Sequence, residues 1–460
     1  MSLAASPIRY PDVASRPLMT RRGWWLVVLN FLIPGSPQVL AGSRRLGRFG
    51  LGATLVLWLL LVAALVCWFV WPTVVFSAVS MAWSLWILAA VLVFYAVLWV
   101  VLTFDTLRIV RLVKTAPSAR GWIAGLTTVL MIALSGGASY GAYLAFTASG
   151  FLNSVFIAGP TEPPDENGRY NILLLGGDSG PDREGMRPDS MSVVSIDADT
   201  GHAVMIGLPR DLEDVPFPDD SPLAQVYPEG YGAIDGCEVD VCMLNSIYTE
   251  VELKSPEMYP DAVARGSEPG IEGMRDAAEG VTGLDIQYYV LIDMQGFEQL
   301  INALGGVDIN VETRIPIGGD EDNDGVDGWI EPGQQHLDGY HALWYGRARY
   351  GVAGGDYERM ARQRVLQEAI LHQFTPGNVL AKFQDVASAG ADTVKTDIPQ
   401  SMLGYFANLA MKTKELPIGQ VELVPDNGID PTDPDFEYIR SLIAQALVPP
   451  SPDPSEQPAG

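Results

Sequence analysis

The stretch Asn171-Ile-Leu-Leu-Leu-Gly-Gly-Asp178 decides the fold of the larger part of this chain. An apolar run that ends in two glycines and a carboxylate predicts a buried β-strand whose end presents a polar group at the edge of a sheet. Other short apolar runs bounded by turn residues predict further strands at Ser192–Asp197, Ala203–Leu208, Gln287–Asp293 and Val307–Val311.

Two helices are expected among these strands. The first carries apolar residues at helical spacing and stops at Gly305-Gly306, and the second runs over Glu358–Phe374. Strands that alternate with helices predict an α/β layered domain with one core. The predicted buried faces are Phe297, Leu300, Ile301 and Leu304 in the first helix, and Val365, Leu366, Ala369 and Ile370 in the second.

Charge is divided unevenly along the 460 residues, whose formal net charge is −26. Residues 1–147 hold eleven Arg or Lys and two acids, a net charge of +9, which leaves 18 basic and 53 acidic residues for the remainder, a net charge of −35. This split indicates two environments. A domain at −35 does not bind nucleic acid by neutralising phosphates, so we expect no nucleic-acid partner.

The amino-terminal part contains apolar stretches long enough to span a bilayer, which needs about 20 residues. A further stretch, 24–42, is broken by Pro34-Gly-Ser-Pro37 and has basic residues on both flanks, which favours a re-entrant or interfacial hairpin over a span. Three spans are therefore favoured and four are the alternative. The three expected spans are 49–71, 82–104 and 122–147.

The positive-inside rule orients these spans consistently, with residues 1–23 in the cytoplasm and those after about 150 outside. We expect no cleaved signal peptide, because the first apolar stretch begins late and is broken by proline. The chain is thus predicted to be a multi-pass protein of the cell membrane with an extracytoplasmic domain. Its expected parts are the membrane region 24–149, a linker 150–169, the outer domain 170–448 and a disordered tail 449–460.

Two of the three cysteines, Cys237 and Cys242, fall in the outer domain only five positions apart. In an oxidising compartment such a close pair usually forms a disulfide. A zinc pair is the alternative, but only four His are present and none lies near. We therefore favour a disulfide.

Arginines are scarce in the outer domain and stand in short clusters beside carboxylates. A planar guanidinium grips phosphate or carboxylate oxygens with two donors, and neighbouring carboxylates suggest a divalent metal that bridges phosphate oxygens. Because the domain hangs from a membrane, a lipid-linked phosphate is the expected ligand. The clusters are Arg187-Pro-Asp189-Ser190, Leu208-Pro-Arg210-Asp211, Tyr345-Gly-Arg347-Ala-Arg349 and Asp356-Tyr-Glu-Arg359-Met-Ala-Arg362-Gln363.

Each cluster also has a simpler interpretation. Asp178 and Asp189 around one loop fit an exposed Asp-rich turn, and Arg210-Asp211 fits a local ion pair. A row of arginines on a helix is usually a solvated face. Arg347 and Arg349 alternate on what we interpret as an extended segment, so both should point to one side.

From Asn171 to Phe374 the chain resembles the LytR-CpsA-Psr family of envelope proteins, in its high-GC Gram-positive form. The resemblance rests on the stretch Asn171–Ser179, on the arginine clusters and on further ordered motifs. These motifs are Leu244-Asn-Ser-Ile-Tyr248, Tyr289–Val311, Leu337-Asp-Gly339, Ala342–Arg349 and Arg359–Gln363.

The resemblance implies an α/β/α layered domain with a mixed sheet and an apolar groove for lipid. It implies an extracytoplasmic, Mg²⁺-dependent (or Mn²⁺-dependent) phosphotransferase that moves a glycopolymer from a polyprenyl-pyrophosphate carrier to peptidoglycan. Asp178 and Asp189 would position the metal. The residues it assigns to the pyrophosphate are Arg187, Arg210, Arg347, Arg349, Arg359, Arg362 and Gln363.

Physically, such a transfer depends on positioning and charge neutralisation, with a sugar hydroxyl as nucleophile. Asp211 is the candidate for orienting or deprotonating that hydroxyl. Two rival functions stay open: a pyrophosphatase that uses water instead, and a non-catalytic module that binds a lipid carrier and regulates envelope assembly.

One acidic segment stands outside the family pattern. Asp320, Asp322, Asp324 and Glu331 match the liganding positions of a D-x-D-x-D-G-x5-E calcium loop. Prolines and glycines on both flanks oppose the helices of a full EF-hand. The segment is therefore either a solvated acidic hairpin tip or a Ca²⁺ loop without helices.

Overall fold

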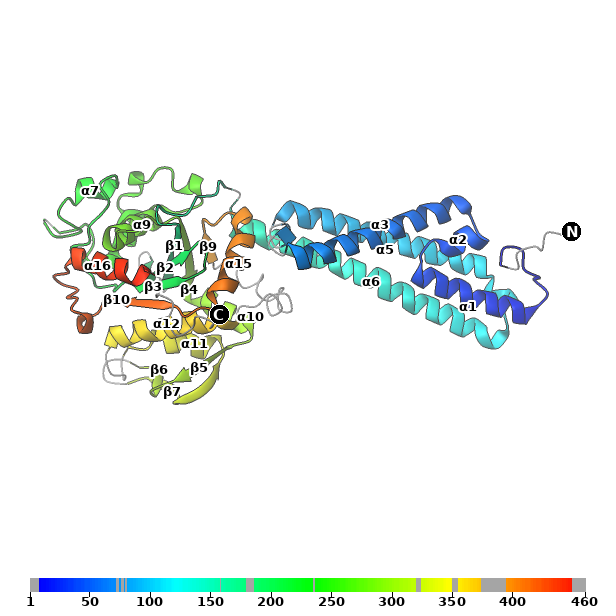
Figure 1. Ribbon diagram of the computed structural model, residues 1–460. Helices are drawn as coiled ribbons and strands as arrows, with labels where there is room; N and C mark the ends of the chain where they lie inside the picture. Colours follow the sequence, from blue (N-terminus) through cyan, green and yellow to red (C-terminus); the bar gives the residue numbers. More distant parts are fainter. Residues whose placement is uncertain are drawn as a thin grey trace, which may run out of the picture. The chain divides into compact units, whose positions relative to one another are not determined.

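The computed structural model describes residues 8–71, 74–75, 78, 81–157, 159–178, 186–234, 236–319, 324–349, 355–373 and 394–448, apart from the side chain of Asp178. The chain divides into two compact units, Met1–Gly150 and Phe151–Gly460. We describe each unit by itself (Figure 1).

The amino-terminal unit is helical. Three of its segments, α3, Ala82–Lys114 and α6, are long and apolar enough to cross a membrane. The stretch expected to form a hairpin contains a helix, a turn and a short second helix. The helices are α1 (Arg16–Leu32), α2 (Ser36–Ala41), α3 (Arg44–Val70), α5 (Ala82–Val110) and α6 (Pro117–Val155), with a short 3-10 turn η1 (Leu112–Lys114) before α6.

The turn between α1 and α2 requires Gly35. Its φ is +95°, and a Cβ there would lie 2.3 Å from the backbone nitrogen of Leu51. Buried polar groups then fix α2 against α5: Gln38 donates from Nε2 to the Leu102 carbonyl at 2.8 Å and to Thr106 Oγ1 at 2.9 Å. Side-chain hydrogen bonds of this kind hold helices together where no water competes.

The second unit is built on a mixed six-stranded sheet in the order β10-β3-β2-β1-β4-β9. β1 pairs antiparallel with β2 and parallel with β4, so the expected mixed sheet is confirmed. The strands are β1 (Arg169–Asp178), β2 (Arg187–Asp197), β3 (Ala203–Gly207), β4 (Tyr288–Asp293), β9 (Val394–Thr396) and β10 (Gly419–Glu422).

Both faces of this sheet are covered. Alternate residues of β1 enter different cores: Leu173 and Leu175 pack on one face, and Tyr170 and Ile172 on the other. The first face is covered by α8 (Ile247–Leu253), α9 (Pro269–Thr282) and α16 (Phe436–Leu447), and the second by α15 (Leu403–Thr413). Short helical segments α7 (Pro222–Val226), η2 (Leu244–Ser246), η3 (Pro256–Met258), η4 (Val263–Arg265), η5 (Gln400–Met402) and η6 (Pro425–Asn427) connect these elements.

A separate, smaller core joins three helices to two hairpin-like strand pairs, β5–β8 and β6–β7. We predicted one core for the domain, and the correction is that this smaller core stands apart from the clusters on the two faces of the sheet. It arises because Ile301, Ala342 and Leu366 pack on the two strand pairs and not on the cluster that contains Leu173. Its elements are α10 (Met294–Leu304), β5 (Val307–Val311), β6 (Ile315–Gly318), β7 (Val326–Ile330), β8 (Gly333–Leu337), α11 (Gly339–Arg347) and α12 (Gly355–Gln373).

Candidate functional site

Asp189 lies at a β-bulge near the start of β2. Gly176 of β1 pairs with Ser190 and Gly177 pairs with Pro188, so Asp189 is the extra residue between them. A bulge re-aims the side chain of its extra residue, which is why bulges often stand beside sites. Asp178 and Asp189 thus stand on the two strands that flank one connection, and Arg187 begins β2 and pairs with Asp178.

Arg210 connects Asp189 to a carboxylate from a distant part of the chain. It follows β3 and its guanidinium lies 2.9 Å from Asp189 Oδ1 and 2.7 Å from Asp356 Oδ2. Burial lowers the pKa of Arg210, but the charges of the two carboxylates outweigh it, so the pKa ends above its ordinary value. The local pair expected between Arg210 and Asp211 is thus replaced by two long-range partners.

Asp356 is the residue that sequence reasoning did not assign. It stands in the first turn of α12 and also lies 3.4 Å from the guanidinium of Arg359. The spacing of i and i+3 from Arg359 was a signal for this contact. Asp356 therefore holds Arg210 and Arg359 together, although the two arginines are about 150 positions apart in the sequence.

Arg359 is buried, with only 4% of the residue exposed. Besides Asp356, it donates to the backbone carbonyl of Asp189 at 3.1 Å. Its Nε is buried and has no hydrogen-bond partner among the described residues. Burial lowers the pKa of Arg359 from its ordinary value. A buried guanidinium with an unused donor is costly unless an anion binds to it.

Arg362 and Gln363, from the next turn of α12, bind the carboxyl end of α11. Arg362 donates to the carbonyls of Tyr345, at 2.9 Å, and Ala348. Gln363 donates to the Gly346 carbonyl at 3.0 Å. Cationic and amide donors satisfy the last carbonyls of a helix in this way. We therefore expect Arg362 to act chiefly by positioning α11.

Arg347 is the last residue of α11, and its guanidinium lies 5.6 Å from the ring centroid of Trp344. The extended segment that we predicted for Arg347 and Arg349 was wrong, because Asp338 caps a helix that runs up to Arg347. Arg349 follows just beyond this helix, and its charge contributes to the lowered pKa of Arg359.

The face of α12 also differs from the prediction. Val365, expected to be buried, is 42% exposed, whereas Arg359, Arg362 and Arg364 are buried. The simpler interpretation of a solvated arginine face does not hold here, because α12 lies between the sheet and the smaller core. Arg364 forms an ion pair with Glu422 of β10, and burial lowers the pKa of Arg364 to about 10.

A cavity of about 350 Å³ lies between β1, β4 and the helices α10, α11 and α12. Along α12 its lining changes from Arg359 and Gln363 to Leu366 and Ile370, so one end is polar and the other apolar. The polar end is next to Asp189. The apolar lining consists mainly of Leu174, Val290, Ile292, Met294, Phe297, Leu300, Ala342 and Leu343, and Arg347 and Gln367 also line the cavity.

The candidate metal ligands are carboxylates at this polar end. Asp178 is aligned with Arg187 across β1 and β2, two positions from Asp189, although its side chain lies outside the described residues. Within the described residues, no group of three or more His, Cys, Asp or Glu side chains gathers as a closed metal site would need. Two carboxylates fit Mg²⁺, which takes few protein ligands and completes its shell with phosphate and water oxygens.

Asp211 is half-buried and follows Arg210 directly. Burial is the largest cause that raises the pKa of Tyr357, which lies on α12 beside Asp356. The negative charge of Asp211 is the second largest cause. Asp211 therefore belongs to the same cluster as the arginines.

The calcium prediction falls partly outside the described residues, since two of its four ligands, Asp320 and Asp322, are not described. Asp324 is exposed, and Glu331 lies 2.9 Å from the guanidinium of Arg314. Arg314 also stacks on Trp329, 4.2 Å from the ring centroid. Glu331 thus already pairs with Arg314, and calcium binding stays a prediction.

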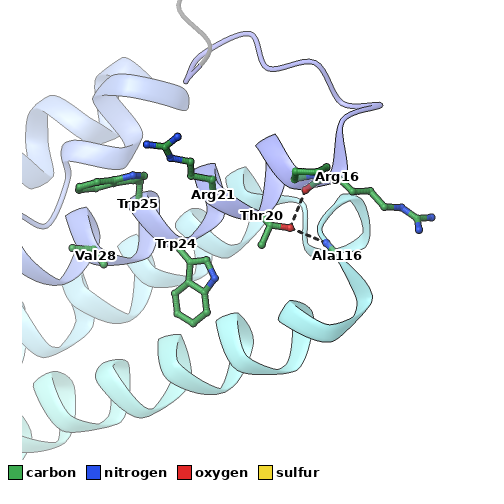
Figure 2. Close-up of a pocket in the computed structure, with 8 residues that line it drawn as sticks. Arg16, Thr20, Arg21, Trp24, Trp25, Val28 and Ala116 are labelled. Atoms are coloured by element: carbon green, nitrogen blue, oxygen red, sulfur yellow. Dashed lines mark hydrogen bonds between the residues drawn. The ribbon is translucent and has the colours of Figure 1, made fainter.

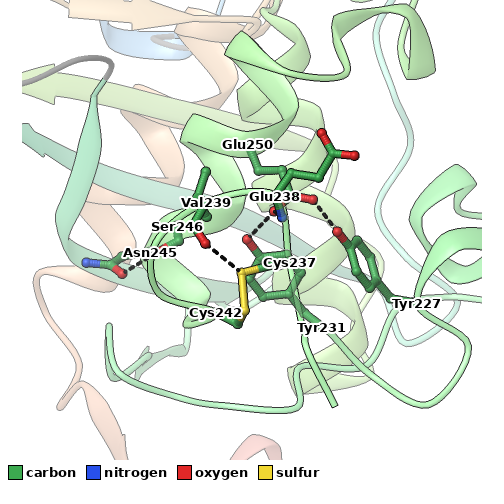
Figure 3. Close-up of a disulfide and its surroundings, with 9 residues drawn as sticks. All are labelled: Tyr227, Tyr231, Cys237, Glu238, Val239, Cys242, Asn245, Ser246 and Glu250. Atoms are coloured by element: carbon green, nitrogen blue, oxygen red, sulfur yellow. Dashed lines mark hydrogen bonds between the residues drawn. A yellow bond between two sulfur atoms is a disulfide. The ribbon is translucent and has the colours of Figure 1, made fainter. Parts of the chain in front are cut away.

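The structure contains the expected Cys237–Cys242 disulfide, with Cα atoms 5.6 Å apart (Figure 3). The loop it closes is anchored through the Glu238 amide, which donates to Glu250 at 3.2 Å, and Tyr231 donates to the same carboxylate at 2.7 Å. Just after the disulfide, the Asn245 amide donates to the Arg210 carbonyl at 3.1 Å. A backbone hydrogen bond three residues after the disulfide thus connects this part of the chain to Arg210.

Comparison with known proteins relates mainly the second unit to a family. The family model described as LytR_cpsA_psr matches residues 150–430. A teichoic acid transferase named TagU from Enterococcus faecalis is 30% identical over 50% of this chain and 61% of its own length, less than two thirds. The cell wall biosynthesis protein LcpA of Corynebacterium glutamicum is 25% identical over 76% of this chain and 71% of its own. A solved LytR-Csp2A-Psr enzyme from Actinomyces oris gives a TM-score of 0.42 at 17% identity, over 64% of this chain and 95% of that one.

Proposed function

This chain belongs to the LytR_cpsA_psr family, and from that premise we propose that it is a membrane-anchored phosphotransferase. In this proposal it takes a glycopolymer from a polyprenyl-pyrophosphate carrier and attaches it to peptidoglycan outside the cell membrane. The observation that carries the proposal is the cavity whose one end is apolar and whose other end holds Arg347 and Arg359.

The apolar end suits part of a polyprenyl chain. A volume of about 350 Å³ lies within the range of about 300–1,000 Å³ usual for small-molecule sites. Side chains such as Phe297, Leu343 and Ile370 are apolar, so a hydrocarbon chain that binds against them removes only apolar surface from water. Three apolar helices are available in the first unit to anchor the chain in a membrane, where such a lipid is found.

The polar end suits a pyrophosphate. Arg359 lines this end, and Asp356 and the Asp189 carbonyl fix the orientation of its guanidinium. Preorganised donors of this kind stabilise the charge that develops during phosphoryl transfer without having to reorganise. Arg210 adds a second guanidinium, held in place by Asp189 and Asp356.

Asp178 and Asp189 would hold Mg²⁺, which when bound supplies charge neutralisation at the phosphate oxygens. Asp189 already binds Arg210 through Oδ1, so its Oδ2 is the oxygen we assign to the metal. Asp211 would orient the attacking sugar hydroxyl and accept its proton. The remaining charged groups bind and position the carrier.

The test is transfer of a short glycan from a polyprenyl-pyrophosphate carrier to peptidoglycan fragments by the full-length protein, with and without a chelator. Arg359→Gln should abolish transfer, whereas Arg265→Gln should not. Arg265 is exposed and pairs with Glu272 away from the cavity, so it controls for the lost charge. Release of phosphate without a glycan product would favour the pyrophosphatase. Lipid binding without turnover would favour the regulator.

A further inference from the structure

The helical unit contains a second cavity that the proposed transferase function does not use. It has a volume of about 680 Å³ and is lined by the first turns of α1 and by Ala116, just before α6 (Figure 2). Arg16, Arg21, Trp24 and Trp25 belong to its lining. We propose that this cavity binds the headgroup of an anionic phospholipid.

Charge is the first support for the proposal. Arg16 and Arg21 are both exposed, and the described lining of the cavity includes no acid. The first 147 residues contain only two acids, Asp12 and Asp105, against eleven Arg or Lys. Basic pockets between membrane helices attract anionic lipid headgroups, and basic residues near a membrane surface are attracted to anionic lipids in general.

The helix ends at the cavity strengthen this attraction. Thr20 Oγ1 accepts a hydrogen bond from the Ala116 amide at 2.9 Å and donates to the Arg16 carbonyl at 2.9 Å. The first of these bonds joins α1 to the residue just before α6, and the second lies within α1. Neither helix has an acidic residue in its first turn, so no carboxylate of the helix itself neutralises the positive end of its dipole. Anions bind favourably at such ends.

The two tryptophans distinguish a lipid from a free phosphate. Trp25 is 58% exposed and extends beside Arg21 in Figure 2, whereas Trp24 points from α1 toward α6 and packs on the apolar cluster beneath. Indole rings favour the level of lipid headgroups, where one edge is polar and the body is apolar. Inorganic phosphate would gain from the arginines but not from these rings.

The experiment measures lipid retention by native mass spectrometry. The full-length protein is released from nanodiscs of phosphatidylcholine with a minor share of phosphatidylglycerol. The wild type should retain phosphatidylglycerol selectively, and Arg16→Gln/Arg21→Gln should lose roughly tenfold in retention. Arg44→Gln/Arg45→Gln is the matched control, because it removes two exposed arginines that are not in the cavity lining, and it should behave as the wild type.

Folding is checked with Arg16→Lys/Arg21→Lys, which keeps both charges and should retain the lipid. Equal loss by the pocket variant and the control variant would show only general surface attraction and would overturn the proposal. Equal retention of phosphatidylcholine and phosphatidylglycerol would do the same. Displacement of the lipid by millimolar glycerol phosphate would assign the cavity to a soluble phosphate instead.

Discussion

Replacement of Arg359 by lysine tests whether bidentate binding of phosphate, and not the buried positive charge alone, is needed for transfer. Lysine keeps the positive charge but loses the fork that reaches both Asp356 and the Asp189 carbonyl. Removing one preorganised donor to a transition state costs about 2–4 kcal/mol, which corresponds to a loss of about 30- to 900-fold in transfer rate. The lost hydrogen bonds should also lower the free energy of unfolding by about 1–3 kcal/mol.

The matched control is Arg364→Lys on the same helix. Arg364 is as buried as Arg359, with 4% exposed, but it pairs with Glu422 and is not in the cavity lining. Both variants should show similar loss of stability in urea unfolding monitored by circular dichroism. Only Arg359→Lys should lose transfer per folded molecule. If the two variants lost transfer equally, Arg359 would be no more than a structural arginine and the assigned site would be refuted.

Two further outcomes follow from buried groups elsewhere in the domain. Burial, the largest cause, raises the pKa of Glu279 to about 7, above its ordinary 4.5. The folded state therefore holds this proton more tightly than the unfolded state, and stability is lost as the pH rises from about 4.5 through 7. Glu279→Gln keeps an acceptor for the Ile286 amide, so its melting temperature should fall less than that of the wild type between pH 5 and pH 8; identical pH profiles would contradict this. Loss of the Cys237–Cys242 disulfide in a double serine variant should cost about 2 kcal/mol of unfolding free energy. A denaturation midpoint unchanged by the substitution would show that the short loop adds no constraint.

The sequence predicted four of the six strands of the sheet, because each is a short apolar run that must be buried, but it did not predict β9 and β10. β1, β3 and β4 lie where such runs occur, and Gly305 ends α10 with φ +85° as a helix-terminating glycine should. The site was predicted only as separate clusters. Which residues meet depends on tertiary contacts, and Asp356 reaches Arg210 across 146 positions.

Two errors share a physical cause, which is that local pattern does not report what packs around an element. α11 was interpreted as extended near Arg347, although Asp338 was available as a helix cap. α12 was expected to have one buried face and one solvated face. The smaller core and the sheet cover α12 from two sides, so arginines at polar positions became buried.

The identity of the lipid in the 350 Å³ cavity tests the central claim most directly. Lipids extracted from purified full-length protein are identified by mass spectrometry, for the wild type and for Leu343→Trp, which fills the apolar end. We expect a polyprenyl pyrophosphate, or its glycan-bearing form, to accompany the wild type and to be lost from Leu343→Trp while the fold is kept. Co-purification of phospholipids alone, unchanged by Leu343→Trp, would contradict the assignment of this cavity to a polyprenyl carrier.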